Sequence, residues 1–291
     1  MSDLGSILLL VLLAFALVGL GWWLLIETEG VYLGRRVVVW LYDLYAGRYD
    51  DIKHFRSDYD HLFLAQPIMD DVAPVKSPLV LDVATGTGRL PLALLNHAHF
   101  QGRVIGLDLS RRMLAHAAPK LDLVRAPLIW CPAERLPFPD DTFDVVTCLE
   151  SLEFMERPDA VLDEMARVLR PGGRLVVTNR RTARLMPGKA WQDADLSDVF
   201  KQAGMSEVEL ARWQVDYDLI WARKRGDSPP ALARPLAEIL RCPCCDEVCL
   251  VETVGGWRCD NCGCRVSTGD DGVLELAPLF NPHLANRPKP E

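Results

Sequence analysis

Residues 79–94 read LVLDVATGTGRLPLAL, an apolar run followed by a glycine turn and then by leucines at helical spacing. This pattern predicts a strand, a tight turn and a helix, the way in which nucleotide-binding sheets begin. The turn departs from the three-glycine fingerprint that cradles a pyrophosphate, because Ala84 replaces the first glycine and only Gly86 and Gly88 follow. Asp82 would also repel a phosphate, so the turn favours a cationic ligand.

A second acidic residue, Asp108, ends the next apolar run, VIGLDLS, twenty residues after Gly88. An acidic side chain at this place hydrogen-bonds ribose hydroxyls in folds of this type. Asp82 and Asp108 together indicate a ligand with a ribose and a positive charge, which is the character of S-adenosylmethionine. An ordinary strand, turn and helix without a ligand stays the alternative for the turn taken alone.

The whole chain has 291 residues, 49% of them hydrophobic, enough for one α/β domain and a smaller unit. Apolar strands alternate with amphipathic helices, which predicts a mostly parallel sheet with an antiparallel hairpin at its edge. We expect strands at 79–83, 103–108, 126–131, 143–148, 173–179, 206–213 and 215–223, and helices at 87–98, 110–120, 158–170 and 194–204. RPGG at 170–173 is expected to end a helix and turn into the fifth strand.

The segment at 5–26, GSILLLVLLAFALVGLGWWLLI, contains no charged residue and is long enough to cross a bilayer. Its flanks lack the basic residues and the cleavage site of a signal peptide, which favours a retained anchor. Arg35 and Arg36 follow it and favour a single-pass protein whose catalytic domain faces the cytoplasm.

Four motifs, which include the two stretches above, carry a family resemblance: VLDVATGTGRLPLAL, VIGLDLSRRML, AERLPFPDDTFDVVTCLESLEF and EMARVLRPGGRLVVTN, in this order. The stretch at about 40–223 closely resembles the class I S-adenosylmethionine-dependent methyltransferases, particularly the branch with the ubiquinone and menaquinone biosynthesis C-methyltransferases. The resemblance implies a Rossmann-like α/β fold with a seven-stranded, mostly parallel sheet. Together with the apolar segment, the cysteine spacing and the proline-containing stretches, it leads us to expect the following domains: a transmembrane anchor at 1–30, the methyltransferase domain at 31–225, a linker at 226–237, a zinc ribbon at 238–280 and a disordered tail at 281–291.

The same resemblance assigns the cofactor-binding positions. The methionine end would meet Asp82, Ala84, Gly86 and Gly88, the ribose Asp108, and the adenine Leu109, Met113 and the backbone of Ala133. Pro132 stands where members often carry an acidic or amide residue. Tyr42 and Tyr49 in YDLYAGRYDD resemble a tyrosine pair that helps to close the pocket, although an aromatic helix face packed on the core explains them equally well.

No catalytic base can be assigned from the motifs, because methyl transfer depends mainly on alignment in a dry pocket. Glu150 and Glu153 follow the fourth strand at the sheet edge where acceptors bind, so they are weak candidates for the base. Capping or solvated loop charges are the alternative. The basic loop NRRTARLMPGK, with Arg180, Arg181, Arg184 and Lys189, is either a solvated face or a site for an anionic headgroup.

Seven of the nine cysteines lie between residues 242 and 264. Cys242-x-x-Cys245 and Cys259-x-x-Cys262 have the spacing of a four-thiolate site for a structural Zn²⁺. Unrelated thiols, a redox pair and an iron–sulfur site are the alternatives, and Cys131 and Cys148 are expected in the core. The cysteine-rich segment also resembles the small zinc-ribbon activator subunits that partner methyltransferases, which implies a possible protein partner.

The sequence thus favours a membrane-anchored methyltransferase that moves a methyl group from S-adenosylmethionine to a lipid-soluble small molecule, such as a quinone precursor or a polar lipid. RNA or protein methylation is the alternative within enzymes, and a formal charge of −8 counts against a nucleic-acid partner. A non-catalytic protein that keeps the fold and binds a partner is the third possibility, supported by Pro132 and by the unassigned base.

Overall fold

The fold is that of a computed structural model, which describes residues 2–181, 186, 191 and 193–280. Arg184 and Lys189 of the basic loop, and the tail at 281–291 for which the sequence predicts disorder, lie outside the described residues.

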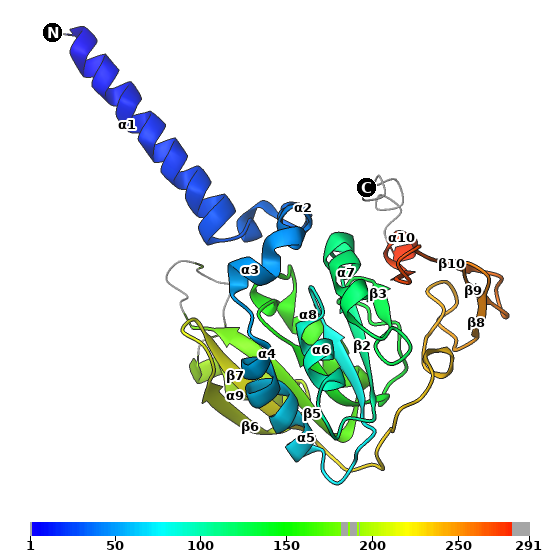
Figure 1. The fold of residues 1–291 in the computed structure, drawn as a ribbon. Helices are drawn as coiled ribbons and strands as arrows, with labels where there is room; N and C mark the ends of the chain where they lie inside the picture. The colour runs from blue at the N-terminus through cyan, green and yellow to red at the C-terminus, as the bar shows by residue number, and fades with distance from the viewer. Residues whose placement is uncertain (1, 182–185, 187–190, 192, 281–291) are drawn as a thin grey trace.

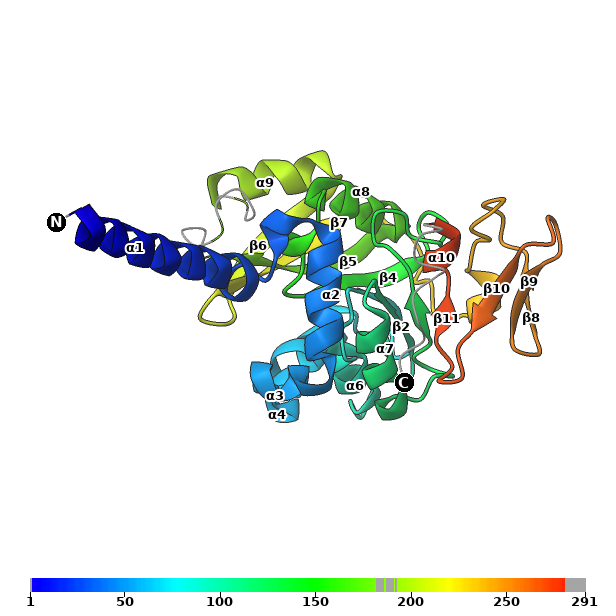
Figure 2. The same cartoon turned by 90° about the horizontal axis from the view of Figure 1, so that it is seen from above.

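The N-terminal helix α1 (Ser2–Trp22) continues into a π-helical turn, η1 (Trp23–Glu27), and extends away from the rest of the molecule (Figures 1 and 2). The stretch Leu4–Glu27 is apolar and long enough to cross a membrane, and none of it is buried against the protein.

A helical segment connects this helix to the sheet. It consists of η2 (Val31–Leu33), α2 (Arg35–Tyr45), η3 (Ala46–Arg48), α3 (Tyr49–Lys53), α4 (Ser57–Asp60), η4 (His61–Ala65) and α5 (Gln66–Asp71). Helix α2 lies across one end of the sheet, between α1 and the body of the protein (Figures 1 and 2).

The strands form one sheet in the order β6-β7-β5-β4-β1-β2-β3-β11-β10-β9-β8. Their bounds are β1 (Leu79–Val83), β2 (Arg103–Asp108), β3 (Leu128–Trp130), β4 (Phe143–Cys148), β5 (Leu169–Arg180), β6 (Met205–Arg212), β7 (Tyr217–Lys224), β8 (Leu250–Thr253), β9 (Gly256–Cys259), β10 (Arg265–Thr268) and β11 (Leu274–Glu275). Strands β1 to β5 are parallel, whereas β7 and β6 form an antiparallel hairpin on β5.

The expectation of a seven-stranded sheet is therefore wrong in its count. Strands β1 to β7 form the expected arrangement. Strand β11 adds to it by pairing in parallel with β3, where Leu274 lies opposite Ile129 and Glu275 lies opposite Trp130. Strands β10, β9 and β8 follow β11 in the same sheet. A second correction concerns RPGG, because β5 already begins at Leu169 and the motif lies within the strand, beside a register shift opposite Phe143 and Val145.

Helices cover both faces of the parallel strands, which explains their continuous apolar sequence. On one face the side chains of Leu79, Leu81 and Val83 share a core with α8 (Pro158–Val168) and α9 (Asp193–Gln202). The opposite face is covered by α5 and α6 (Arg89–Leu95), and by α7 (Arg111–Ala117) with the short turn η5 (Ala118–Lys120) near β3. Cys131 and Cys148 are fully buried, as expected.

The segment at 226–237 follows the sheet closely. The backbone N–H of Ala231 donates to Asp144 Oδ1 at 2.8 Å, and Arg170 Nη1 donates to the carbonyl of Ser228 at 2.9 Å. Beyond it lie η7 (Leu236–Glu238), the cysteine-rich strands and α10 (Ala277–Phe280), with η6 (Leu152–Phe154) the remaining short turn. The domain boundaries expected from the sequence stay predictions.

Candidate cofactor site and cysteine cluster

The glycine turn after β1 uses left-handed backbone at three positions. Ala84, Gly86 and Gly88 have φ of 57°, 56° and 82°. A Cβ on Gly86 would meet nothing within 4 Å, whereas a Cβ on Gly88 would lie 3.0 Å from Leu121 and 3.1 Å from Ala117. Gly86 thus keeps space open above the turn, and Gly88 lets α6 begin close to the end of α7.

Asp108 lies at the end of β2 and organises this turn. Its Oδ2 accepts from the backbone N–H of Gly86 at 2.8 Å, and its Oδ1 accepts from that of Ser110 at 2.7 Å. Burial raises the pKa of Asp108 to about 6, and the two N–H donors oppose that shift. Ser110 also caps α7, since its Oγ accepts from the N–H of Met113 at 3.2 Å.

Asp82 lies next to β2 at the same end of the sheet and is only 3% exposed. The hydroxyls of Thr85 and Thr147 each donate to one of its carboxylate oxygens at 2.6 Å. Burial again raises the pKa to about 6, against the effect of these two hydroxyls. The buried carboxylate of Asp82 and the half-buried carboxylate of Asp108 therefore both have weakened acidity and lie at the same end of neighbouring parallel strands, an arrangement suited to a cationic or polyhydroxylated ligand.

Two adjoining cavities lie over this end of the sheet. The first contains seven of the ten cofactor-binding positions predicted from the sequence: Tyr42, Tyr49, Ala84, Gly86, Asp108, Leu109 and Ala133. The second is lined by Asp82, Thr85, Thr87 and Arg89, and shares Tyr49, Ala84, Gly86, Leu149 and Glu150 with the first. Met113 and Gly88 line neither cavity, because Met113 is buried in the core and Gly88 packs against α7.

Tyr42 and Tyr49 close the first cavity on the side of α2 and α3. Their ring centroids lie 5.8 Å apart, and the Tyr42 hydroxyl donates to Glu29 Oε2 at 2.7 Å. Burial is the main reason why the pKa of each tyrosine is well above its ordinary value. Both rings face a cavity, so packing on the core is not their whole role.

Glu150 and Glu153 are both buried, at 7% and 3% exposure, so the alternative of solvated loop charges is wrong. Glu150 lines both cavities, and its Oε1 accepts from Arg89 Nη1 and Gln214 Nε2, each at 2.9 Å. Glu153 lies outside the lining of both cavities and accepts from the Tyr217 hydroxyl at 2.5 Å. Burial raises the pKa of Glu153.

The sequence analysis missed Arg89, which lines the second cavity, and Asp50, which contacts the glycine turn. Arg89 donates through Nε to Asp60 Oδ1 at 2.7 Å and lies over the ring of Phe55, 4.2 Å from its centroid. Asp50 accepts from the Thr87 hydroxyl and pairs with Lys120 at 2.6 Å. These contacts fasten α3 and α4 to the glycine turn, and they join residues too far apart in the chain for any spacing rule to reveal.

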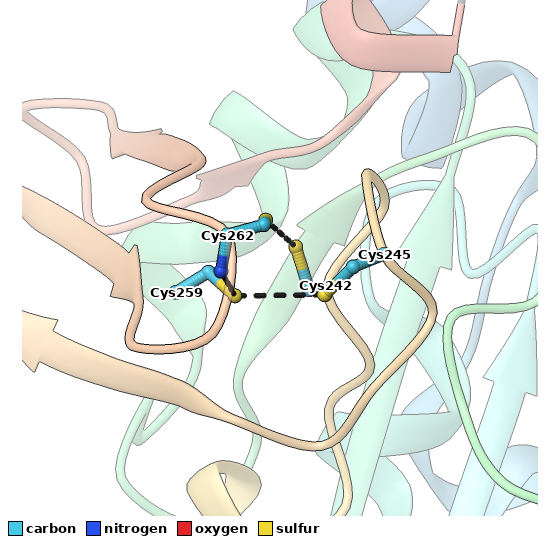
Figure 3. Close-up of side chains that lie close together, drawn as sticks. All are labelled: Cys242, Cys245, Cys259 and Cys262. Atoms are coloured by element: carbon cyan, nitrogen blue, oxygen red, sulfur yellow. Dashed lines mark hydrogen bonds between the residues drawn. The ribbon is translucent and has the colours of Figure 1, made fainter.

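The cysteine-rich segment brings two turns together (Figure 3). The Sγ atoms of Cys242 and Cys262 lie 3.6 Å apart, as do those of Cys245 and Cys259, and all four lie within 4.8 Å of one another. Four thiolates at Zn–S distances near 2.3 Å stand about 3.8 Å apart, so the set fits a tetrahedral Zn²⁺.

Other cysteines surround this set. Cys244 and Cys264 form a disulfide, and Cys249 Sγ lies 3.2 Å from Cys259 Sγ. Of the three cysteines outside the predicted ligand set, Cys249 alone therefore keeps a free thiol.

Comparison with known proteins assigns the central part of the chain. Residues 81–177 match the family model described as "Methyltransferase domain". Among curated relatives, the ubiquinone/menaquinone biosynthesis C-methyltransferase UbiE of Roseobacter denitrificans is 35% identical over 153 residues, 51% of this chain and 60% of its own length. The UbiE of Paraburkholderia phymatum is 45% identical over 100 residues, 34% of this chain and 41% of its own length. The chain thus spans about half the length of these relatives.

Solved structures extend the likeness in fold. A chain from the complex between the Haloferax volcanii Trm112 methyltransferase activator and a methyltransferase matches with a TM-score of 0.53 and 21% identity, covering 65% of this chain and 97% of its own. An S-adenosyl-L-methionine-dependent methyltransferase from Methanococcus maripaludis matches with a TM-score of 0.51 and 18% identity, covering 64% and 94%. Residues 81–177 therefore match a methyltransferase domain by sequence, and the Rossmann-like α/β fold around them resembles that of the two methyltransferase structures.

Proposed function

We propose that this protein is a membrane-anchored methyltransferase that transfers a methyl group from S-adenosylmethionine to a lipid-soluble small molecule, with a quinone precursor or a polar lipid as the substrate class. The observation that carries the proposal is the pair of carboxylates, Asp108 in the lining of the first cavity and Asp82 in that of the second, within the stretch that matches the methyltransferase family model. The relatives named for ubiquinone and menaquinone biosynthesis support the quinone precursor as the acceptor.

The donor groups fit S-adenosylmethionine. Each oxygen of Asp108 accepts one backbone N–H, which leaves lone pairs for two ribose hydroxyls. Asp82 supplies a negative charge for an ammonium group, and Gly86 leaves room for the ligand above the turn. Bound there, the cofactor would supply a methyl group from its sulfonium: a nucleophilic atom of the acceptor bonds to the methyl carbon, the carbon–sulfur bond breaks, and the neutral thioether leaves with the electron pair.

Among the two carboxylates predicted as weak candidates for the base, Glu150 is the better placed because it lines both cavities. Arg89 and Gln214 fix its orientation by donating to Oε1, and its carboxylate could accept a proton or a hydrogen bond from the acceptor. Glu153 is held by Tyr217 outside the cavity lining, which favours a positioning role.

The apolar helix gives the proposal its membrane component. With Leu4–Glu27 in the bilayer, Arg35 and Arg36 would follow the span immediately and favour a cytoplasmic location of the site. A reporter joined after the cysteine-rich segment should therefore be active only in the cytoplasm. Activity of the reporter on the opposite side of the membrane would contradict this orientation.

We also propose that Cys242, Cys245, Cys259 and Cys262 hold one structural Zn²⁺. Four thiolates leave no open position for a substrate, so the metal would stabilise the ribbon without taking part in methyl transfer. A protein partner that binds the ribbon stays a further possibility.

The test uses the full chain in phosphatidylcholine nanodiscs. Binding of S-adenosylmethionine is measured by calorimetry, and transfer of a tritiated methyl group is followed into lipid, RNA and protein fractions. Asp108→Ala should lower the affinity about 10- to 150-fold, the effect of about 1.5–3 kcal/mol for a hydrogen bond to a charged group. Asp198→Ala, on the exposed surface of α9, is the matched control.

Two results would contradict the proposal. Equal affinities in Asp108→Ala and Asp198→Ala would remove the cofactor assignment. Label that appears only in RNA or protein would replace the lipid-soluble acceptor with one of the alternative substrates.

A further inference from the structure

A third cavity, of about 260 Å³, lies between the end of the apolar helix and the two helices that close the cofactor site. Leu25 and Ile26 of η1 form one wall, and Leu41 of α2 and Ile52 of α3 form the other. Most of its lining is aliphatic or aromatic, so an apolar group would be stabilised there relative to water.

This cavity adjoins the cofactor site. Tyr42 and Tyr49 line both it and the cavity that contains Asp108, so the two spaces are separated by side chains that belong to both. The centroids of these two rings are 5.8 Å apart. A molecule whose apolar part occupies the third cavity could therefore present its head between the tyrosines to the site of methyl transfer.

The position of the cavity along the apolar helix places it at a membrane surface. A helix of the 24 residues Leu4–Glu27 rises about 36 Å, whereas a hydrocarbon core is about 30 Å thick. The last turn, with Leu25 and Ile26, would then lie at the boundary between the acyl chains and the headgroups. The cavity would open where an amphiphile leaves the bilayer.

The junction that forms this cavity is well packed. Trp23 stacks on Tyr32 with centroids 5.3 Å apart, and the backbone N–H of Gly30 donates to the carbonyl of Leu24 at 2.9 Å. A Cβ on Gly30 would lie 2.9 Å from Val37 and 3.0 Å from Leu41. The end of the apolar helix is thus held against α2 by close contacts.

The polar groups of the cavity lie near the tyrosines. Glu29 Oε2 accepts from the Tyr42 hydroxyl at 2.7 Å, and Lys53 Nζ lies 3.8 Å from Glu29 Oε1. An occupant with an apolar tail and a polar head would match this arrangement, its tail against Leu25, Ile26 and Ile52.

Resting on the proposed function, we propose that this cavity is the entry and tail-binding site of the methyl acceptor, and that the acceptor is an amphiphile with a long apolar tail. The acceptor leaves the bilayer beside Ile26, its tail stays between η1 and α3, and its head reaches the cofactor site past Tyr42 and Tyr49.

The experiment uses the full chain in phosphatidylcholine nanodiscs and a hydroquinone with a decyl tail that carries a terminal diazirine. After irradiation, the cross-linked peptides are identified by mass spectrometry. We expect labelling within residues 25–26 and 41–53, and competition by decyl hydroquinone but not by hydroquinone without a tail.

Ile52→Trp fills the cavity from an exposed position on α3, and Ile26→Trp fills it from the opposite wall, so the test does not depend on one variant folding. Each should lower the labelling about tenfold, because excluding about two methylene groups has that effect on affinity. Leu44→Trp, at an exposed leucine of α2 outside the lining, is the control and should label normally.

Several results would overturn the inference: labelling outside these residues, equal labelling of the Ile52→Trp and Leu44→Trp variants, or stronger labelling by a phosphatidylcholine with a diazirine in its acyl chain. The last result would identify the occupant as an ordinary membrane lipid. Binding of S-adenosylmethionine, measured separately, distinguishes these results from failure of the proposed function, because Ile52 lies outside the lining of both cofactor cavities.

Discussion

Arg111 joins the cysteine-rich segment to the sheet, and its replacement should loosen that joint. Its Nη1 and Nη2 donate to the two oxygens of Asp271 at 2.8 Å each, and its Nε donates to Glu275 Oε1 at 3.2 Å. The Arg111 side chain is 13% exposed, and those of Asp271 and Glu275 are 28% and 22% exposed. We expect Arg111→Met to retain the packing of the aliphatic stem and to remove all three charged hydrogen bonds.

The expected magnitude lies between two limits. Exposed ion pairs contribute about 0–1 kcal/mol, whereas removing one partner of a buried pair costs about 3–5 kcal/mol. Because the Arg111 pair is partly exposed and bidentate, we expect its removal to lower the local free energy of unfolding by about 2–3 kcal/mol. Hydrogen exchange of the peptides that cover β10 and β11, measured on the zinc-loaded full chain, should then be about 30- to 150-fold faster.

Arg258→Met, which removes an exposed pair with Asp260, is the matched control and should change exchange little. Because Arg111 begins α7 directly after Asp108, Leu109 and Ser110, we also expect weaker binding of S-adenosylmethionine in Arg111→Met. Exchange in β10 and β11 no faster than in the control would refute the reasoning. An unchanged cofactor affinity, with faster exchange, would show that the ribbon and the cofactor site are energetically independent.

Three further outcomes follow from the site and the cluster. Burial raises the pKa of both Asp82 and Asp108 to about 6, so the affinity for the cationic cofactor, measured by calorimetry, should fall as the pH decreases through about 6. Over the same range the contribution of these two carboxyls to folding stability should rise, because their pKa is higher in the folded state than in the unfolded state. An affinity that does not change between pH 7 and pH 5 would contradict the assignment. Ala84→Gly should raise the free energy of unfolding by up to about 1 kcal/mol in urea titrations, because relief of left-handed strain exceeds the entropic cost of glycine; destabilisation would show that the Ala84 methyl group packs usefully. Cys259→Ser should abolish stoichiometric zinc in metal analysis of the purified full chain, whereas Cys249→Ser should retain it; equal zinc contents would exclude this ligand set.

The sequence predicts the central sheet well because its signals are local. The alternation of apolar strands and helices predicts β1 to β7. Asp82 and Asp108 are predicted as site residues because the first precedes the glycine turn and the second ends the next strand. The position of RPGG was mispredicted, because glycine and proline break helices as readily as they begin an irregular strand.

Contacts between distant segments account for the rest. Nothing in the spacing of Arg89, Asp60 and Glu150 indicates that they form one buried ion cluster. The same holds for β11, whose two residues are too few to show alternation and which is recognised as a strand only through its pairing with β3. The tyrosines near the site were found through the family resemblance, and their second role beside the apolar helix needed the structure.

The pairing of β11 with β3 has a consequence for folding during synthesis on the ribosome. The ribosome makes each residue of β11 145 positions after its partner in β3, and at roughly 5–20 residues per second this delay lasts roughly 7–30 s. During that interval β3 is an open edge able to recruit a strand from another chain, while the apolar helix made earlier can already engage the membrane. A chain that terminates before Leu274 would keep the edge of β3 unpaired. We therefore expect premature termination products to aggregate or to be degraded more readily than the full-length chain.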